Sequence, residues 1–302
     1  MLDKSKNYEN ERIIVNEQSN AFDGSVSLSK SKLVWFFSMF ITATIGGYST
    51  FSIDAFLLFL GFTAITLCFG HSLGMHRKLI HQSYKCPKWL EYVFVHLGVI
   101  VGIAGPRGMM QTHDLRDWAQ RQPCCHDYFA HRQSILKDAY WQILCDIRLG
   151  HPPIFLPESN FISDKTYQNM EKYWMWQQIP WVVLFFTMGG IAWVIWGVCM
   201  RVTVSIIGHW LIGYFAHNKG DQDWHVQGAC VQGYNVKFMG LITMGECWHN
   251  NHHAFPNSAC LGQKPHQADP GWWVLRILNK LGLVSEIILP EDLPKRSELT
   301  SL

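Results

Sequence analysis

The sequence predicts an all-α integral membrane protein, with four transmembrane helices as two hairpins and a helical cytoplasmic cap that carries a metal site. Three observations support this class: two long apolar stretches, a shortage of charge, and histidines placed just beyond each stretch. Of the 302 residues, 48% are hydrophobic and 16% are charged, against about 25% charged in soluble domains. A mean hydropathy of +0.02 excludes a protein that lies mostly within the bilayer.

Residues 1–32 are polar and mixed in charge, which predicts a disordered cytoplasmic tail ahead of a single membrane domain, 33–302. The first apolar stretch begins too late and is too long for a signal peptide. The net charge of +2 is spread along the chain, so we expect no nucleic-acid surface. Nine cysteines without a disulfide-scaffold spacing indicate reduced thiols.

The two apolar stretches, about 33–70 and 176–215, each predict a helical hairpin. They contain 38 and 40 residues and one formal charge each, Asp54 and Arg201, whereas one span needs about 20 apolar residues. Asp54 follows Ser and Thr residues where a turn and a helix N-cap are expected. Arg201 lies past the midpoint, and we expect it to snorkel to the far interface. The rival interpretation, a soluble protein with two buried helical pairs, conflicts with so little charge over both stretches.

Basic residues predict the orientation of these hairpins. Of the 25 Lys and Arg residues, 24 lie in 1–32, 71–175 and 216–302, which the positive-inside rule places in the cytoplasm. The cap therefore comprises 71–175 and 216–302. Aromatic residues mark where the hairpins enter the bilayer: Trp35, Tyr173, Trp174, Trp176 and Trp181.

Two shorter apolar segments predict helices that do not span. Residues 92–105 are too few to cross a bilayer and contain His96, so we expect a buried or interfacial helix. From Asp269 onward, apolar residues recur at helical spacing with Arg276 and Lys280 between them. This pattern predicts an amphipathic helix on the inner leaflet.

Histidines follow the first hairpin at intervals of five: His71, His76 and His81. Residues five apart on an ideal α-helix point about 140° apart. His71 and His76 would therefore meet one ion only if the helix end unwinds or if they flank a site between helices. They could equally be interfacial histidines in a basic segment.

The second hairpin ends in a stripe formed by His209, Gly213 and His217, each four residues apart. A histidine inside a membrane helix is costly and indicates function. For His209, a neutral imidazole hydrogen-bonded between helices is the alternative.

The motif GECWHNNHHAFP, residues 245–256, carries His249, His252 and His253 on one helical face. Three nitrogen donors so placed suit a divalent metal such as iron or zinc.

A central group contains His113, Asp114, Arg116, Asp117 and Arg121, followed by His126 and His131. His113 and Asp117, four apart, could bind one metal together. Alternatively, the acidic and basic residues form a salt-bridged lattice that only orients the ligands. The sequence leaves both interpretations open.

Together these features resemble the membrane fatty acid desaturase family, in its bacterial acyl-CoA (delta-9-like) branch. The resemblance covers about residues 33–283 and rests on the two hairpins, the motif HSLGMH (71–76), Ala216–His217 and the motif of 245–256. It implies a cytoplasmic di-iron site held mainly by histidine, O2 as oxidant, and removal of two hydrogens from a CH2–CH2 unit. The implied partners are a fatty acyl chain on CoA, acyl carrier protein or lipid, and an electron donor such as ferredoxin, cytochrome b5 or a flavoprotein reductase.

The chain departs from the family pattern in the second histidine motif, which is usually HxxHH. Here it reads HDLRD, with Arg116 and Asp117 where two ligand histidines belong, and Gly213 replaces the family's asparagine. Asp117 could substitute as an oxygen ligand, with His209, His126 or His131 supplying nitrogen. Alternatively, one metal is lost.

The sequence thus predicts an iron- and O2-dependent enzyme that introduces a double bond into a fatty acyl chain. The alternatives are a hydroxylase, acetylenase or decarboxylase on the same scaffold, a membrane metal-binding protein, or an inactive relative. We expect a multi-pass protein of the bacterial inner membrane with its active site on the cytoplasmic side. The expected catalytic residues are His71, His76, His113, His217, His249, His252 and His253, and the expected metal ligands are these together with Asp117, His126 and His209.

Overall fold

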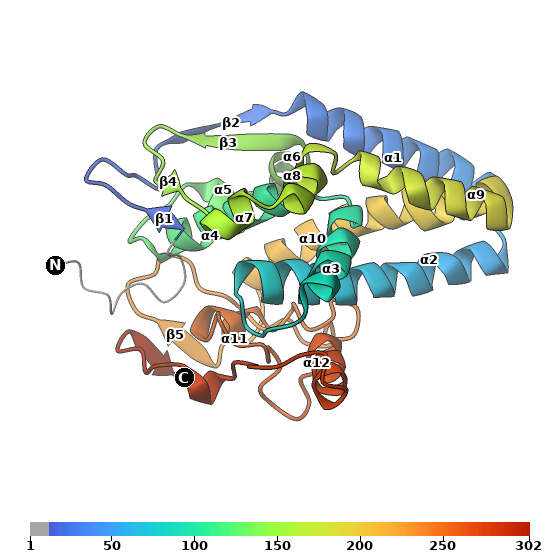
Figure 1. The fold of residues 1–302 in the computed structure, drawn as a ribbon. Coiled ribbons are helices and arrows are strands. Elements are labelled where there is room, and N and C mark those ends of the chain that lie inside the picture. Colours follow the sequence, from blue (N-terminus) through green and yellow to red (C-terminus); the bar gives the residue numbers. More distant parts are fainter. Residues whose placement is uncertain (1–11) are drawn as a thin grey trace.

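The computed structural model describes residues 12–302 and consists of a long helical arm joined to a cap (Figure 1). Four helices form the arm and lie side by side: α1 (Lys30–Ser49), α2 (Ile53–Ile65), α9 (Ile179–Val194) and α10 (Arg201–Asn218). The helix α2 continues into the cap as a π-helical segment, Thr66–Ile80, and a shorter π-helical segment, Ile195–Met200, joins α9 to α10. The predicted, mainly helical class is confirmed.

The cap contains shorter helices and three two-stranded antiparallel sheets. Its helices are α3 (Lys88–Ile100), α4 (Pro106–Arg121), α5 (Asp127–Ala130), α6 (Ile135–Leu144), α7 (Ser159–Ile162), α8 (Lys165–Lys172), α11 (His249–Ala254) and α12 (Pro270–Lys280), with single 3-10 turns at Trp176–Gln178 and Pro290–Asp292. Its strands are β1 (Ile13–Ile14), β2 (Gly24–Leu28), β3 (Cys145–Leu149), β4 (Ile154–Phe155), β5 (Trp224–Val226) and β6 (Leu299–Ser301).

Each apolar stretch folds back on itself near the far end of the arm. In the first, Ser52 begins α2 and its hydroxyl accepts from the Ala55 amide at 3.4 Å, so the turn falls beside Asp54 as predicted. In the second, Gly190 interrupts α9 with φ +65° and ψ −158°, a conformation open essentially only to glycine. The indole of Trp193 donates to Asp54 Oδ2 at 2.6 Å and thereby joins the two hairpins.

Arg201 does not snorkel, so that prediction is wrong. Its side chain is fully buried and donates to the carbonyls of Gly197 and Ile100 and to Gln178 Oε1, at 2.6–2.8 Å. These acceptors satisfy the guanidinium inside the protein, which removes the need to reach water. Arg201 consequently anchors the second hairpin to the end of α3.

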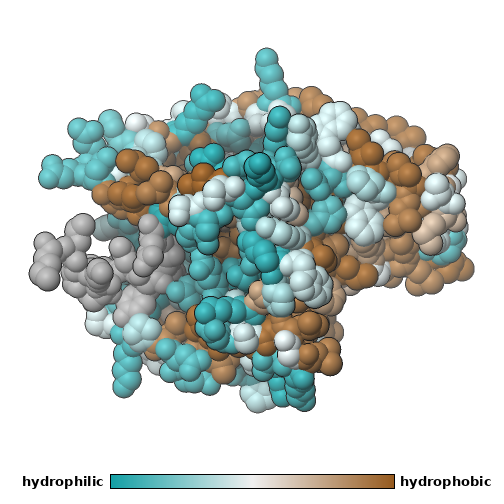
Figure 2. All heavy atoms as spheres, in the orientation of Figure 1, coloured by the Kyte–Doolittle hydropathy of each residue, from teal (hydrophilic) through white to brown (hydrophobic). Residues whose placement is uncertain are grey.

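The surface of the arm is apolar and that of the cap is largely polar (Figure 2). Large hydrophobic side chains stay exposed along α1, α2 and α9, with Ile45, Ile53 and Met188 among them. Such a continuous apolar surface marks a face that meets another apolar phase. Two stretches are long and apolar enough to cross a membrane, Ile53–Ile80 and Trp176–Asn218, and the second contains the break at Gly190.

The predicted disorder of the N-terminal tail is wrong for the part that the structure describes. Strand β2 pairs with β3 from Gly24 opposite Leu149 to Leu28 opposite Cys145, and β1 pairs with β4. Val26 packs against a buried cluster that includes Trp118 and Phe129. Since β2 and β3 lie more than a hundred residues apart, local composition carried no sign of this pairing. Residues 1–11 lie outside the described range.

The π-helical segment Thr66–Ile80 packs closely against α3, which confirms a buried helix within 92–105. A Cβ atom at Gly70 would collide with the backbone of Leu97 and Gly98, so glycine is required for this approach. The helix α12 is amphipathic as predicted, with Leu275 buried and Trp273, Ile277 and Leu281 exposed.

Candidate metal centre

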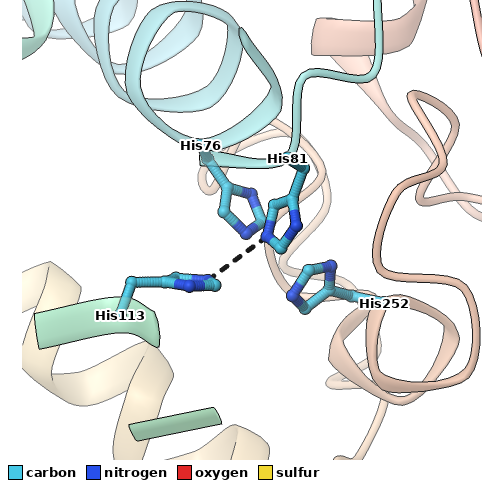
Figure 3. A group of neighbouring side chains, drawn as sticks. All are labelled: His76, His81, His113 and His252. Atoms are coloured by element: carbon cyan, nitrogen blue, oxygen red, sulfur yellow. Dashed lines mark hydrogen bonds between the residues drawn. The ribbon is translucent and has the colours of Figure 1, made fainter. Parts of the chain in front are cut away.

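The first histidine cluster comprises His76, His81, His113 and His252. One potential ligand atom of each lies within 4.8 Å of those of the other three. The rings come from three places in the chain, the end of the π-helical segment, α4 and α11, and they point toward a common centre (Figure 3). His81 Nε2 lies 3.4 Å from His113 Nε2.

π-Helical winding explains why His76 and His81 meet. The amide of His81 donates to the carbonyl of His76 at 3.0 Å, an i to i+5 hydrogen bond that stacks the two residues one turn apart. An α-helix would have turned them away from each other. The pair that enters the cluster is therefore His76 and His81 rather than His71 and His76. The spacing of five was visible in the sequence, but our predicted site residues did not include His81.

The second histidine cluster comprises His217, at the end of α10, with His249 and His253 from α11. His249 Nε2 lies 3.2 Å from His217 Nε2 and 3.0 Å from His253 Nε2. The three nitrogen atoms thus face the same small volume. His249 and His253 lie one α-helical turn apart, as predicted from the motif.

The geometry of both clusters suits metal binding. Two nitrogen ligands about 2.1 Å from one ion lie about 3.0 Å apart at a right angle and about 3.4 Å apart at a tetrahedral angle. One Nε2 separation in the first cluster, 3.4 Å, and two in the second, 3.0 and 3.2 Å, fall within this interval, and all ligand atoms of each cluster lie within 4.8 Å of one another. The residues present therefore fit two metal ions.

Burial keeps four of the cap histidines neutral, as metal ligation requires. Desolvation, with help from the neighbouring imidazoles of His76 and His113, lowers the pKa of His249 to about 3. Burial also lowers the pKa of His81, His252 and His253 well below the ordinary range. At neutral pH these imidazoles offer a free nitrogen lone pair.

A carboxylate contact and a hydrogen bond behind the ligands orient two of the rings. His76 Nδ1 lies 2.6 Å from Glu246 Oε2, and Glu246 Oε1 accepts from the Ser72 hydroxyl at 2.5 Å. Burial raises the pKa of Glu246, but His76 and Arg77 outweigh this and hold it below its usual range. His217 Nδ1 donates to the Gly213 carbonyl at 2.7 Å, which leaves Nε2 directed at His249. Metal-ligating histidines commonly have such partners.

The two asparagines of the third motif fix α11 in place. Asn250 Nδ2 donates to the carbonyls of Trp224 and Gly233. Asn251 Nδ2 donates to the Leu261 carbonyl at 2.8 Å. Because the asparagines face away from the clusters, the same short helix is anchored on one side and presents histidines on the other.

Several predicted ligands lie outside both clusters. His71 and His209 instead meet each other, with ring centroids 5.0 Å apart, one π-helical turn nearer the arm than His76. His126 caps α5, where its Nδ1 accepts from the Tyr128 amide at 3.1 Å. We therefore omit these three from the ligand set.

In the HDLRD segment, both carboxylates lie beside the ligand His113, which is compatible with either of its two interpretations. Asp114 pairs with Arg12 at 3.2 Å, and Asp117 Oδ2 lies 3.7 Å from His113 Nδ1. Arg116 contacts Gln142 instead of a carboxylate. Asp117 does line the cavity that touches both clusters, so its part in metal binding stays a prediction.

Three cavities surround the histidines and share lining residues. The central cavity, of about 120 Å³, touches both clusters. The α2–α10 cavity, of about 340 Å³, is mostly apolar and shares His71, His209 and Glu246 with the central one. The α1 cavity, of about 140 Å³, shares Arg116 and His209 with the central one and is lined by Trp35 and Trp174.

Fold and site together define a helical protein in which an apolar arm adjoins a buried, paired histidine centre. The model for the family described as "Fatty acid desaturase" matches residues 54–274. The sn-1 stearoyl-lipid 9-desaturase of Anabaena variabilis is 30% identical over 75% of this chain and 81% of its own length. The acyl-CoA 5-desaturase AL21 of Anemone leveillei is 28% identical over 82% and 76%, and the sn-2 palmitoyl-lipid 9-desaturase of Nostoc sp. (strain 36) is 27% identical over 84% of each.

The chain belongs to the fatty acid desaturase family. It is therefore an oxidoreductase that acts on fatty acids, and the predicted resemblance at the level of the family is confirmed.

Proposed function

We propose that the two histidine clusters hold two iron ions, and that the chain uses them with O2 to introduce a double bond into a fatty acyl chain. The observation that carries this proposal is the spacing of the Nε2 atoms, 3.0–3.4 Å, within two buried clusters that face one cavity. His76, His81, His113 and His252 would hold one ion. His217, His249 and His253 would hold the other.

Bound iron would supply the oxidation of an unactivated CH2–CH2 unit. This reaction consumes O2, two electrons from a donor and two protons, and it forms a double bond and two molecules of water. The residues of the chain provide the surroundings. Burial of both clusters keeps bulk water away from the reacting atoms. The Glu246 carboxylate lies against His76 Nδ1, and the Gly213 carbonyl holds the proton on His217 Nδ1. The apolar α2–α10 cavity would take part of the acyl chain.

For the finer topology, we propose four membrane spans, with both segments of the cap, 71–175 and 216–302, on the cytoplasmic side. The break at Gly190 and the turn before Ser52 support two hairpins, and the distribution of Lys and Arg supports the orientation. The exposed Trp273, Ile277 and Leu281 of α12 would enter the inner leaflet. The proposed location is a bacterial inner membrane, and a ferredoxin or flavoprotein reductase would deliver the electrons.

The test is expression in a host of known lipid composition, with gas chromatography and mass spectrometry of the fatty acids and iron analysis of the purified protein. We expect a new unsaturated acid and two iron ions per chain. The variant His249→Ala should give neither the new acid nor full iron content, because it removes the nitrogen closest to both other ligands of the second cluster. A hydroxylated product would show that the chain is a hydroxylase instead of a desaturase. A wild-type protein that stays free of iron after anaerobic reconstitution would refute the proposal.

A further inference from the structure

Arg116 belongs to the altered second motif and is a member of neither histidine cluster. It follows His113 by one turn of α4 and lines both the central cavity and the α1 cavity. The α1 cavity is otherwise formed mainly by apolar and aromatic side chains, among them Trp35, Phe36 and Trp174. Arg116 therefore presents a cation where an apolar chamber meets the histidines.

The guanidinium of Arg116 is held in place but incompletely bonded. Its Nη2 donates to Gln142 Oε1 at 2.7 Å, and Gln142 Nε2 in turn donates to the Tyr128 carbonyl at 2.7 Å. Its Nε is buried and has no hydrogen-bond partner. Within residues 12–302, no carboxylate oxygen lies within 4.0 Å of this guanidinium.

The three buried arginines of the described residues differ in this respect from Arg116, which is half-buried. Arg12 and Arg77 each contact a carboxylate, at 3.2 and 2.7 Å, and Arg201 donates to three oxygen atoms. A partly buried cation without a counter-ion is less favourable than a paired one. The unused donors of Arg116 also form a planar set of the kind that binds a carboxylate with two parallel hydrogen bonds.

We propose that Arg116 binds the carboxylate of an unesterified fatty acid, which makes a free acid the substrate at this site. The inference rests on the proposed function and narrows its substrate class. A single guanidinium balances the single charge of a carboxylate. The other cation of the α1 cavity, Lys32, is already paired with Asp146 at 2.9 Å, so a phosphate group would lack a second donor. A CoA thioester or a lipid ester has no charge at the acyl carbonyl.

This placement has a consequence for the acyl chain. With its carboxylate at Arg116, the first carbon atoms would lie in the central cavity, and the remaining methylene groups would continue into the apolar α2–α10 cavity. The oxidised carbons would then lie near the carboxyl end.

The test is equilibrium binding to the iron-loaded protein without an electron donor, so that no turnover occurs. A radiolabelled C16 or C18 fatty acid is displaced by the unlabelled acid, its methyl ester or its CoA thioester. In the wild type, we expect the acid to bind at least about tenfold more tightly than the methyl ester. In Arg116→Gln, the affinity for the acid should fall to the affinity for the ester. Arg116→Lys should retain part of the difference between the two affinities.

Arg107→Gln is the matched control, because Arg107 lies exposed at the start of the same helix. It should leave the preference for the acid unchanged. Iron content and thermal unfolding of each variant show whether it is folded. Equal binding of acid and ester by the wild type, or a preference for the acid that survives Arg116→Gln, would overturn the inference. Desaturation of esterified chains alongside either result would leave the proposed function intact.

Discussion

Replacing His81 with alanine should remove one metal ion and leave the other. His81 is one of four histidines in the first cluster, and its Nε2 lies 3.4 Å from that of His113. The variant leaves three donors in the first cluster and does not touch the second. Mutating a residue that only supports a metal ligand costs about 10–100-fold in affinity. Loss of the ligand itself should therefore cost at least about 100-fold, or roughly 2.8 kcal/mol.

The assay is metal analysis by mass spectrometry, with Mössbauer spectroscopy of protein loaded with ⁵⁷Fe. We expect the iron content to fall from two ions per chain to one, with loss of one spectral component and of desaturase activity. The matched control is His71→Ala, because His71 lies one π-helical turn earlier and contacts His209 instead of the cluster. It should retain both ions. Full iron content in His81→Ala together with loss of an ion in His71→Ala would refute the π-helical account of the site.

Three further variants test the surroundings of the centre. Asp117→Ala should lower iron content, because its carboxylate lines the central cavity beside His113, whereas unchanged iron and rate would remove Asp117 from the ligands. Glu246→Gln weakens the 2.6 Å contact to His76 Nδ1 and should reduce iron affinity about 10–100-fold in a metal titration, while Glu286→Gln on the surface should not. Arg77→Met leaves Asp269 buried without its cation and should lower the free energy of unfolding by roughly 3–5 kcal/mol. Thermal unfolding measures this loss, and Lys85→Met, in an exposed pair, should show almost none.

Sequence patterns predicted the hairpins and the third motif because both depend on local periodicity. Long runs without charge have few structural uses other than apolar helices, and histidines three and four apart share a helical face whatever surrounds them. The turns beside Asp54 and the grouping of His249 with His253 follow from these rules.

The features that the sequence did not reveal depend on non-local contacts or on unusual winding. Strand β2 pairs with β3 across the cap, so the composition of the tail could not predict its order. Arg201 finds its acceptors on Gln178 and at the end of α3, which no pattern within its own stretch records. His81 joins the first histidine cluster because the segment is π-helical, whereas the usual period of 3.6 residues would place positions 76 and 81 on different faces.

The departures of this chain from the family pattern converge on one side of the centre. Gly213 leaves room for His131, whose ring lies 3.5 Å from the position of a Cβ atom there and stacks on His217. His131 Nδ1 in turn lies 2.9 Å from the buried carboxylate of Asp138, and Arg116 lines the same cavity as this ring. A Cβ atom at position 213 would already be in van der Waals contact with His131, so the glycine and the histidine occupy adjoining space. The first cluster keeps four histidines despite these changes. We infer that the altered residues adapt the second cluster and the polar end of the substrate, while the binding of the first metal ion is preserved.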